Sequence, residues 1–334
     1  MTKAKNELYQ MDALLSALQK AGSILLFSHI SPDGDTLGSA LALKLRLERL
    51  EKRVCLVLDG DVPTNLRFLP GVESILCPDA EVSPEGFSLS VAVDVSCEER
   101  LGAGAERFKS AGTTALIDHH ATNDGFAAIN VIDGDAPATA VLIHRLFEAL
   151  GGPASRDEAI CLYTALSTDT GNFVYESTNA ECFRMMGSLM EAGLPLSQYS
   201  RMLFRQKERA FVELLGKTLP SLRLSCGGAV AGLTLSLLQM KEAQATAGNT
   251  DGVVDYAIDI EGVKLAYFAR ETAEGRVKVS LRALEPYRVD EAAECFGGGG
   301  HRLAAGCTLD LPLEDAARAV EAALHTAAGS VCAL

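Results

Sequence analysis

Short apolar runs alternate with amphipathic segments along the first half of the chain. Continuous apolar runs of this length are typical of strands buried in a parallel sheet, because helices cover both faces of such a sheet. The segments between them repeat apolar residues at helical spacing. The expected strands are 23–29, 53–59, 89–96 and 113–120, and the expected helices are 5–20, 36–50, 137–151 and 156–171. This alternation predicts an α/β fold with a doubly wound parallel sheet.

The pattern changes after about residue 187, where a charged segment with helical character follows. Beyond it, apolar and polar residues mix in a way that favours strands, and a helix is expected to close the chain. These strands are expected within 221–236, 263–272 and 275–284, and the helix over 315–329. We therefore predict a larger α/β domain over 1–187, a helical linker over 188–219 and a smaller mixed α/β domain over 220–334.

Composition and charge limit the classes of function. The 334 residues are 48% hydrophobic and carry 30 Lys and Arg against 44 Asp and Glu, a formal net charge of −14. The apolar fraction excludes a disordered chain, and the length predicts two domains. No apolar run reaches the roughly 18 to 20 residues of a membrane span, and no secretory signal opens the chain, so we expect a cytoplasmic protein. The acidic balance disfavours long duplex nucleic acid and favours a small anionic substrate held by local cations or metal ions.

The nine cysteines are scattered without a CxxC pair. Most lie in apolar surroundings, as Cys55 and Cys161 do. We therefore expect buried thiols, no disulfide framework and no zinc knuckle.

Carboxylates and imidazoles collect where the predicted strands end. They are His29 at the end of the first strand with Asp33 and Asp35 just after it, Asp94 near the end of the third, Asp118, His119 and His120 at the end of the fourth, and Asp169 at the end of a helix. Turn, capping or surface roles can account for most of them singly, but an unpaired carboxylate inside an apolar strand costs several kcal/mol. Because ligands of open parallel sheets bind beyond the carboxyl ends of the strands, we expect these groups to converge on one edge.

The chemistry of this set fits hard divalent cations. Carboxylates and imidazoles without a thiolate suit Mn²⁺ or Mg²⁺ better than a structural zinc ion. The set exceeds the needs of one ion with open positions, whereas two ions roughly 3.5 to 4 Å apart, sharing a carboxylate, would use it fully. Such a pair activates water and stabilises the charge on a phosphoryl group. The sequence therefore predicts hydrolysis of a phosphate ester or anhydride, without choosing among substrates.

The same residues carry a resemblance to a known family. The segment 29–35 (HISPDGD), Asp94 in VAVDVS, the triplet 118–120 (DHH) and Asp169 in STDTGNF resemble the four motifs of the DHH phosphoesterase family. The run GGGGHRLAAG resembles the signature of the DHH-associated C-terminal domain. The similarity covers essentially the whole chain in the expected order. At this length the chain is similar to the bacterial nano-RNase type, which combines oligoribonuclease and 3′-phosphoadenosine 5′-phosphate (pAp) phosphatase activities.

The resemblance implies two Mn²⁺ ions per subunit, with Mg²⁺ as the alternative. It implies that one ion is held by His29, Asp33 and Asp94, and the other by Asp35, Asp94, His119 and Asp169. His120 would contact the substrate phosphate and give a proton to the leaving oxygen, and Asp118 would orient a ligand histidine. The implied substrates are pAp and single-stranded RNA of about two to five nucleotides, degraded to mononucleotides. A homodimer is also expected.

The glycine run suggests a phosphate clamp in the second domain. Glycines let backbone N–H groups approach an anion closely, and neither a P-loop nor a Rossmann fingerprint fits the run. A flexible linker is the alternative. Residues 264–302 hold seven Lys or Arg against six acids, so this region is relatively cationic for the chain. The predicted substrate-binding residues are Gly298, Gly299, Gly300, His301 and Arg302, with Arg270 and Arg282 as candidates that could instead be surface charges.

Other functions stay open at this point. A phosphodiesterase for cyclic di-AMP or a linear dinucleotide is the nearest alternative, and an inorganic pyrophosphatase would be expected to have a Lys- and Arg-rich anion site instead of the glycine run. A long-strand exonuclease conflicts with the net charge, and a non-catalytic nucleotide-binding module predicts lost ligands. Candidates for base stacking are Phe173, Tyr175, Tyr267 and Phe268, with core packing as their alternative role.

Overall fold

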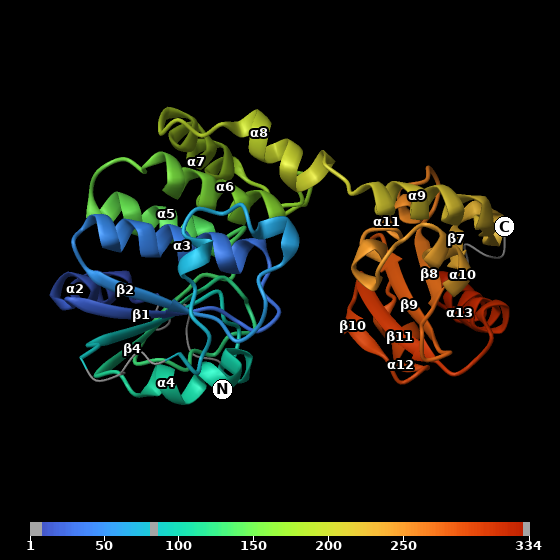
Figure 1. Cartoon of the computed structure of the whole chain (residues 1–334), viewed down its shortest axis with the longest axis horizontal. Coiled ribbons are helices and arrows are strands. Elements are labelled where there is room, and N and C mark those ends of the chain that lie inside the picture. The colour runs from blue at the N-terminus through green and yellow to red at the C-terminus, as the bar shows by residue number, and fades with distance from the viewer. Residues whose placement is uncertain (1–8, 81–85, 330–334) are drawn as a thin grey trace. The chain divides into compact units, whose positions relative to one another are not determined.

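The computed structural model describes residues 9–80 and 86–329 (Figure 1). The chain divides into two compact units, Met1–Gln206 and Lys207–Leu334, each with its own sheet.

The first unit is built on a five-stranded parallel sheet with the order β2-β1-β3-β4-β5. Its strands are β1 (Ser23–Phe27), β2 (Arg53–Val57), β3 (Leu89–Val93), β4 (Thr113–Asp118) and β5 (Ile129–Ile132). The predicted doubly wound parallel sheet is confirmed. The sequence pattern missed β5, which is only four residues long.

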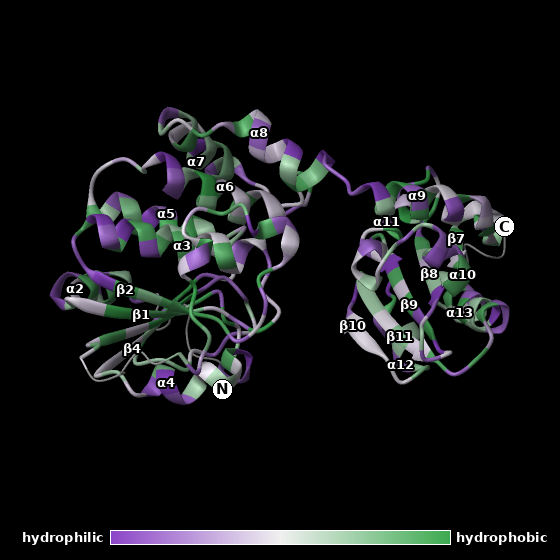
Figure 2. Cartoon of the chain, viewed as in Figure 1, coloured by the Kyte–Doolittle hydropathy of each residue, from purple (hydrophilic) through white to green (hydrophobic). Residues whose placement is uncertain are grey.

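Helices cover both faces of this sheet, which explains why its strands are apolar throughout. The helices α2 (Met11–Lys20), α3 (Gly34–Arg49), α5 (Thr139–Leu150), α6 (Arg156–Asp169) and α7 (Ala180–Glu191) share one core with the strands. On the other face, Phe27 of β1 packs edge-on against Phe108 of α4 (Ala105–Lys109). Figure 2 shows hydrophobic residues along the strands of the sheet and polar residues on the outer helix surfaces.

The helices α3 and α6 approach each other closely at Gly38. A Cβ added at Gly38 would lie 2.5 Å from the carbonyl oxygen of Cys161 and 2.9 Å from Cβ of Ala165. Only glycine fits between these backbones. The contact matters for the site because α3 begins beside Asp33 and α6 ends at Asp169.

We expect Gly38→Ala to destabilise the protein by about 1–3 kcal/mol, because a methyl group must be forced into a filled space. The matched variant Gly187→Ala lies in α7, where nothing comes within 4 Å of the added Cβ. It should stabilise the protein by about 0.5–1 kcal/mol, since alanine favours helix more than glycine does. Denaturant unfolding of both variants checks the pair, and equal effects of the two substitutions would contradict the close approach of α3 and α6.

The segment predicted as a helical linker consists of separate pieces. They are α8 (Leu196–Ser200), a π-helical turn (Arg201–Arg205) and α9 (Arg209–Thr218). Gln206 and Glu208 have extended backbones (ψ 125° and 148°), so the helical path stops between the turn and α9. The division between the units falls here, at Gln206 and Lys207.

The second unit contains a mixed six-stranded sheet with the order β10-β11-β9-β8-β7-β6, as the prediction of a mixed α/β domain requires. The strands are β6 (Arg223–Ser225), β7 (Val230–Leu235), β8 (Leu265–Glu271), β9 (Val277–Ala283), β10 (Gly299–His301) and β11 (Ala304–Leu309). Among these six described strands, only β7 and β8 pair in parallel. The helices are α10 (Leu237–Glu242), α11 (Asp255–Ile258), α12 (Asp290–Glu294) and α13 (Leu313–Ala328), besides α9.

The expectation for the cysteines was wrong in two respects. Cys77, Cys97 and Cys295 are exposed free thiols, because they lie in turns and at a helix end and not in strands. Cys226 is disulfide-bonded. Cys161 is a buried free thiol as expected, and Cys55 is half-buried. Among the described residues, no helix is both long enough and apolar enough to cross a membrane.

Candidate metal centre and active site

The predicted metal-binding residues meet at the carboxyl edge of the first sheet. His29 follows β1 and Asp94 follows β3, and these two strands are neighbours where the strand order reverses. Clefts of doubly wound sheets bind ligands at this point. Three overlapping groups have ligand atoms within 4.8 Å of one another: His29, Asp33 and Asp94; Asp35, His119 and Asp169; and Asp94, His119 and His120.

Asp94 lies between the groups and presents one carboxylate oxygen to each side. Its Oδ2 is 3.8 Å from Nε2 of His29. Its Oδ1 is 3.9 Å from Nε2 of His119 and 3.8 Å from Nδ1 of His120. A carboxylate oriented in this way can join two neighbouring cation sites.

The backbone and two hydroxyl groups fix this orientation. Asp94 has a positive φ of 60°, a conformation that costs a non-glycine residue about 1 kcal/mol or more. The hydroxyl of Thr36 donates to Oδ2 (2.6 Å), and the hydroxyl of Thr139 donates to Oδ1 (2.9 Å). Backbone strain next to a cluster of charged groups is typical of functional sites.

The first turns of α5 and α3 orient the two carboxylates that follow β1. The backbone N–H groups of Thr139 and Ala140 donate to the two oxygens of Asp35 (2.7 and 3.1 Å). The hydroxyl of Ser39 adds a third donor to Asp35 (2.9 Å). Asp33 caps α3 through the N–H of Thr36 (3.0 Å), and its side chain is 62% exposed. Asp35 is therefore rigid and buried, whereas Asp33 faces solvent.

Backbone carbonyl groups set the orientation of two histidine rings. Nδ1 of His29 lies 2.7 Å from the carbonyl oxygen of Ile30, and Nδ1 of His119 lies 3.1 Å from that of Ala136. In His119, a proton on Nδ1 would donate to this carbonyl and leave Nε2 with a free lone pair, whereas Nδ1 of His29 also lies 2.9 Å from Nη2 of Arg100, which can only donate. In His119 this Nε2 faces Asp169 (3.3 Å) and Asp35 (3.8 Å). Metal-ligating histidines commonly have this arrangement.

His120 is held by a different partner from the other two histidines. Its Nδ1 lies 2.7 Å from Oδ1 of Asp118, and the amide of Asn123 donates to Oδ2 of Asp118 (2.6 Å). We expected Asp118 to orient a ligand histidine, but Asp118 bonds His120, two residues further along the chain, while His119 bonds a backbone carbonyl. The hydrogen bond to Asp118 raises the pKa of His120 to about 9.

The carboxylates repel one another in the absence of bound cations. Burial, with the charges of Asp94 and Asp169, raises the pKa of Asp35 well above its usual value. Burial also raises the pKa of Asp169 to about 6, although His119 opposes the shift. Ionised carboxylates at such positions need positive charge beside them. This donor set, all oxygen and imidazole nitrogen, fits divalent cations.

These pKa shifts predict how metal binding depends on pH. Folded Asp169 keeps its proton up to about pH 6, whereas the unfolded chain loses it near pH 4, so the metal-free protein loses stability as the pH rises through this window. A cation competes with that proton. We expect Mn²⁺ to bind roughly tenfold more weakly at pH 5 than at pH 7.5 and to raise the melting temperature less. Thermal melts with and without Mn²⁺ at both pH values check this prediction. An equal rise of the melting temperature with Mn²⁺ at both pH values would contradict it. So would an equally strong pH dependence of this rise in Asp169→Asn.

In the second unit, strand pairing places part of the predicted clamp on one face of the sheet. Residues directly opposite on neighbouring strands share a face. His301 lies opposite Ala304, which lies opposite Arg282. The backbones of His301 and Arg282 are therefore two strands apart, roughly 10 Å. Arg270 lies on the same face but four positions from this row, about 13 Å along β8.

The glycine run is an edge hairpin instead of an open loop. Gly299 and Gly300 pair with β11, and all three residues of β10 are exposed. Gly298 packs so closely on Gly306 and Cys307 that no side chain fits. Arg302 lies beyond β10, where its guanidinium bonds Glu285 (2.8 Å) and the carbonyl oxygen of Pro286 (3.0 Å). Arg302 is thus committed to the neighbouring turn.

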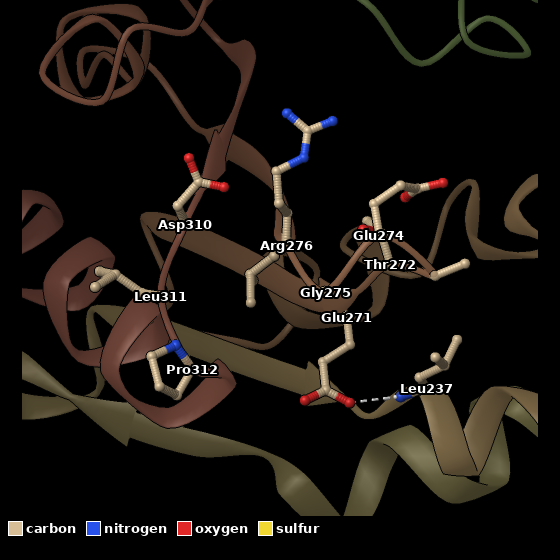
Figure 3. Close-up of a pocket in the computed structure, with 11 residues that line it drawn as sticks. Leu237, Glu271, Thr272, Glu274, Gly275, Arg276, Asp310, Leu311 and Pro312 are labelled. Carbon is tan, nitrogen blue, oxygen red and sulfur yellow. Dashed lines mark hydrogen bonds between the residues drawn. The ribbon is translucent and has the colours of Figure 1, made fainter.

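A separate hollow of about 530 Å³ lies in the second unit, lined by the β8–β9 turn and by residues that follow β11 (Figure 3). Glu271 accepts a hydrogen bond from the N–H of Leu237 at its floor (2.8 Å). The side chains of Arg276 and Asp310, which both line it, extend to the same side in Figure 3. None of the predicted clamp residues lines it.

Both units of this chain are similar in sequence to known protein families. Residues 23–166 match the DHH family, N-terminal domain, and residues 229–329 match the DHHA1 domain. The chain is 34% identical over 290 residues to the bifunctional oligoribonuclease and PAP phosphatase NrnA of Thermus thermophilus, covering 86% of this chain and 84% of that protein. The chain belongs to the DHH family. It is a phosphoesterase of this family, and the predicted resemblance is confirmed.

Two further known proteins are similar to this chain over most of its length. The bifunctional oligoribonuclease and PAP phosphatase NrnA of Bacillus subtilis is 26% identical over 301 residues, covering 89% of this chain and 92% of that protein. A crystal structure of an exopolyphosphatase-related protein from Bacteroides fragilis superposes with a TM-score of 0.87 at 27% identity. It covers 95% of this chain and 96% of that one.

Sequence reasoning missed the residues that position the site. They are Thr36, Ser39, Thr139, Asn123 and Arg100, whose Nη2 lies 3.4 Å from the carbonyl oxygen of Ile30. A hydroxyl at a helix start has a capping role in most proteins, so its contact with a distant carboxylate gives no signal in the sequence. Of these five residues, Asn123 was the easiest to predict from the sequence, because it follows the DHH triplet by three residues.

Proposed function

We propose that this DHH-family phosphoesterase is a two-metal phosphohydrolase that degrades short RNA oligonucleotides, of about two to five nucleotides, to mononucleotides. We propose that it also removes the 3′-phosphate of pAp. The observation that carries the proposal is the orientation of Asp94, with one oxygen toward His29 and the other toward His119. The relatives named for these two activities support the choice of substrates.

The proposed ligands follow the overlapping groups at the sheet edge. His29 and Asp33 would hold one cation, and Asp35, His119 and Asp169 the other, with Asp94 shared. Two Mn²⁺ ions, or Mg²⁺ in their place, would supply a water nucleophile and neutralise charge on the phosphoryl group. Thr36 and Thr139 keep Asp94 in its shared orientation, and three donors keep Asp35 in place.

His120 is the proposed proton donor. Its ring is 36% exposed, so it can reach a substrate, and its raised pKa of about 9 keeps it protonated at neutral pH in the metal-free protein. Asp118 holds the imidazolium through Nδ1, which leaves Nε2 to donate to a leaving oxygen. Asn123 fixes Asp118 in turn.

We propose that the edge hairpin of the second unit binds a substrate phosphate. His301 and Arg282 share a face, and Nε of Arg282 also lies 3.3 Å from Asp255. Successive N–H groups of a strand point to opposite sides, so one of the N–H groups of Gly299 and Gly300 faces the open sheet edge and could bind an anion. Arg302 would act mainly by holding the turn at Glu285, and Arg270 would contact a more distant group. His301→Ala should weaken binding of pAp, whereas Arg288→Ala, which breaks an exposed pair with Asp290, should not.

The proposal is tested by product release from pAp, a linear dinucleotide, cyclic di-AMP and pyrophosphate, each with added Mn²⁺. We expect turnover of pAp and the dinucleotide and little of the other two. Turnover of the cyclic dinucleotide alone would replace the proposal with a cyclic dinucleotide phosphodiesterase. Release from pyrophosphate alone, or from none of the four, would overturn it.

A further inference from the structure

The aromatic side chain of Tyr175 is exposed six residues after the candidate metal ligand Asp169. The segment 170–178 follows α6 and leads to α7. Within it, Tyr175 is 60% exposed and Val174 is 80% exposed, so two apolar side chains face solvent beside the most polar part of the first unit. An exposed ring of this kind loses hydrophobic stabilisation unless something covers it.

The backbone of this segment is held tightly. The N–H groups of Val174 and Tyr175 both donate to the carbonyl oxygen of Thr170 (3.0 Å each), and the N–H of Asn172 donates to that of Ser167 (2.6 Å). Gly171, Asn172 and Phe173 all have positive φ values of 55°, 57° and 68°. Strain of this kind persists only where the surroundings over-determine it, and it clusters at ligand clamps and active sites.

Gly171 supports the ring of Tyr175 from one side. A Cβ at Gly171 would lie 2.5 Å from Cε1 and Cζ of Tyr175, so the ring packs on the glycine backbone. Gly171 is two residues from Asp169, at most about 7.6 Å along the chain. The ring therefore packs on the backbone two residues from the candidate ligand Asp169, and 60% of the side chain is exposed.

The remaining candidates for base stacking have other contacts. Tyr267 and Phe268 are 1% and 2% exposed in the second sheet. Phe173 is half-buried and packs against Phe183, with ring centroids 5.6 Å apart. Among these four candidates, only Tyr175 keeps a largely open ring.

We propose that Tyr175 stacks on a nucleobase of the substrate whose phosphate lies at the Asp94 site, and so makes the enzyme select nucleotides over simple phosphate esters. Base stacking tolerates every base, because each has a π face. The inference rests on the proposed function for its substrate, and it adds a residue that determines specificity. It also accounts for an exposed tyrosine on a strained, rigid support.

The test compares Tyr175→Ala with Tyr175→Phe and with Phe183→Ala, which removes an equally exposed ring on α7. We expect Tyr175→Ala to raise KM for a dinucleotide roughly 5- to 150-fold with little change in kcat, and the other two variants to stay close to wild type. Dinucleotides that lack the base at one or the other position complete a double-mutant cycle, in which the loss of the base is combined with the loss of the Tyr175 ring. One of them should bind wild type weakly, and Tyr175→Ala should add no further loss for it.

Binding of a dinucleotide containing 2-aminopurine, followed by its fluorescence, separates this inference from the proposed function. Weaker binding by Tyr175→Ala than by Tyr175→Phe supports stacking even if wild type hydrolyses no nucleotide. Active wild type with the same affinity in both variants overturns stacking alone. Absence of binding by wild type overturns both.

Discussion

Asp94→Asn should lower kcat for pAp and for a dinucleotide by about 10³-fold or more, while the protein stays folded. The substitution keeps the shape of the side chain and tolerates the positive φ at this position, because asparagine adopts that conformation readily. It removes the one negative charge that faces both His29 and His119. Steady-state kinetics at saturating Mn²⁺ and substrate measure the loss.

The matched control is Asp124→Asn, which neutralises an exposed carboxylate close in sequence to the DHH triplet. It should leave kcat within about twofold of wild type, as expected for a surface substitution away from special features. Near-normal turnover by Asp94→Asn would mean that no shared carboxylate is needed, and the two-metal assignment would then be wrong. A melting temperature close to that of wild type separates lost chemistry from lost folding.

Arg46→Ala should destabilise the first unit by about 3–5 kcal/mol, the expected loss when one partner of a buried ion pair is removed. Arg46 and Glu158 are both fully buried and form a two-bond pair, at 3.0 and 3.2 Å. The guanidinium also bonds the carbonyl oxygens of Gly151, Gly152 and Pro153 and lies 3.9 Å above the ring of Phe147. The substitution removes the two-bond partner of Glu158, which keeps a longer contact with the half-exposed Arg49 (3.5 Å). It also removes the Arg46 donor from the carbonyl groups of Gly151 and Gly152, while Pro153 still accepts from Arg49 (2.9 Å).

Thermal unfolding should show this loss as a drop of roughly 6–20 °C in the transition of the first unit. Replacing both partners, as in Arg46→Met with Glu158→Leu, should recover much of the stability, because apolar residues of similar volume avoid the unpaired charge. The exposed pair Arg209 and Glu213 gives the comparison: Arg209→Ala should change stability by no more than about 1 kcal/mol. A loss at Arg46 as small as that at Arg209 would contradict the account of the buried pair.

The first sheet and the candidate metal site at its edge were predictable because both follow from local patterns. Each apolar run predicts a buried strand, and the carboxyl ends of parallel strands lie at one edge of the sheet. His29 and Asp94 both lie at strand ends in the sequence, so they are expected to meet at that edge. The switch point between β1 and β3 depends on strand order, which the sequence does not reveal. The neighbours of Asp94 are beyond local patterns too, since Thr36 and Thr139 lie 58 and 45 residues away.

The second unit was predicted less well, because its features depend on non-local pairing. Four successive glycines suggest an open loop, yet Gly299 and Gly300 find partners in β11 and form a strand. Register alone decides that His301 and Arg282 share a face, while Arg302 turns to Glu285. The buried pair of Arg46 and Glu158, 112 residues apart, was hidden for the same reason.

Calorimetric titration of the metal-free protein with Mn²⁺ at pH 7.5 tests the central claim most directly. The arrangement of ligands around Asp94 predicts two ions per chain in wild type, and fewer than two, or a much weakened second ion, in Asp94→Asn. Binding of a single ion by wild type, or of two ions with unchanged affinity by Asp94→Asn, would contradict a centre built on a shared carboxylate.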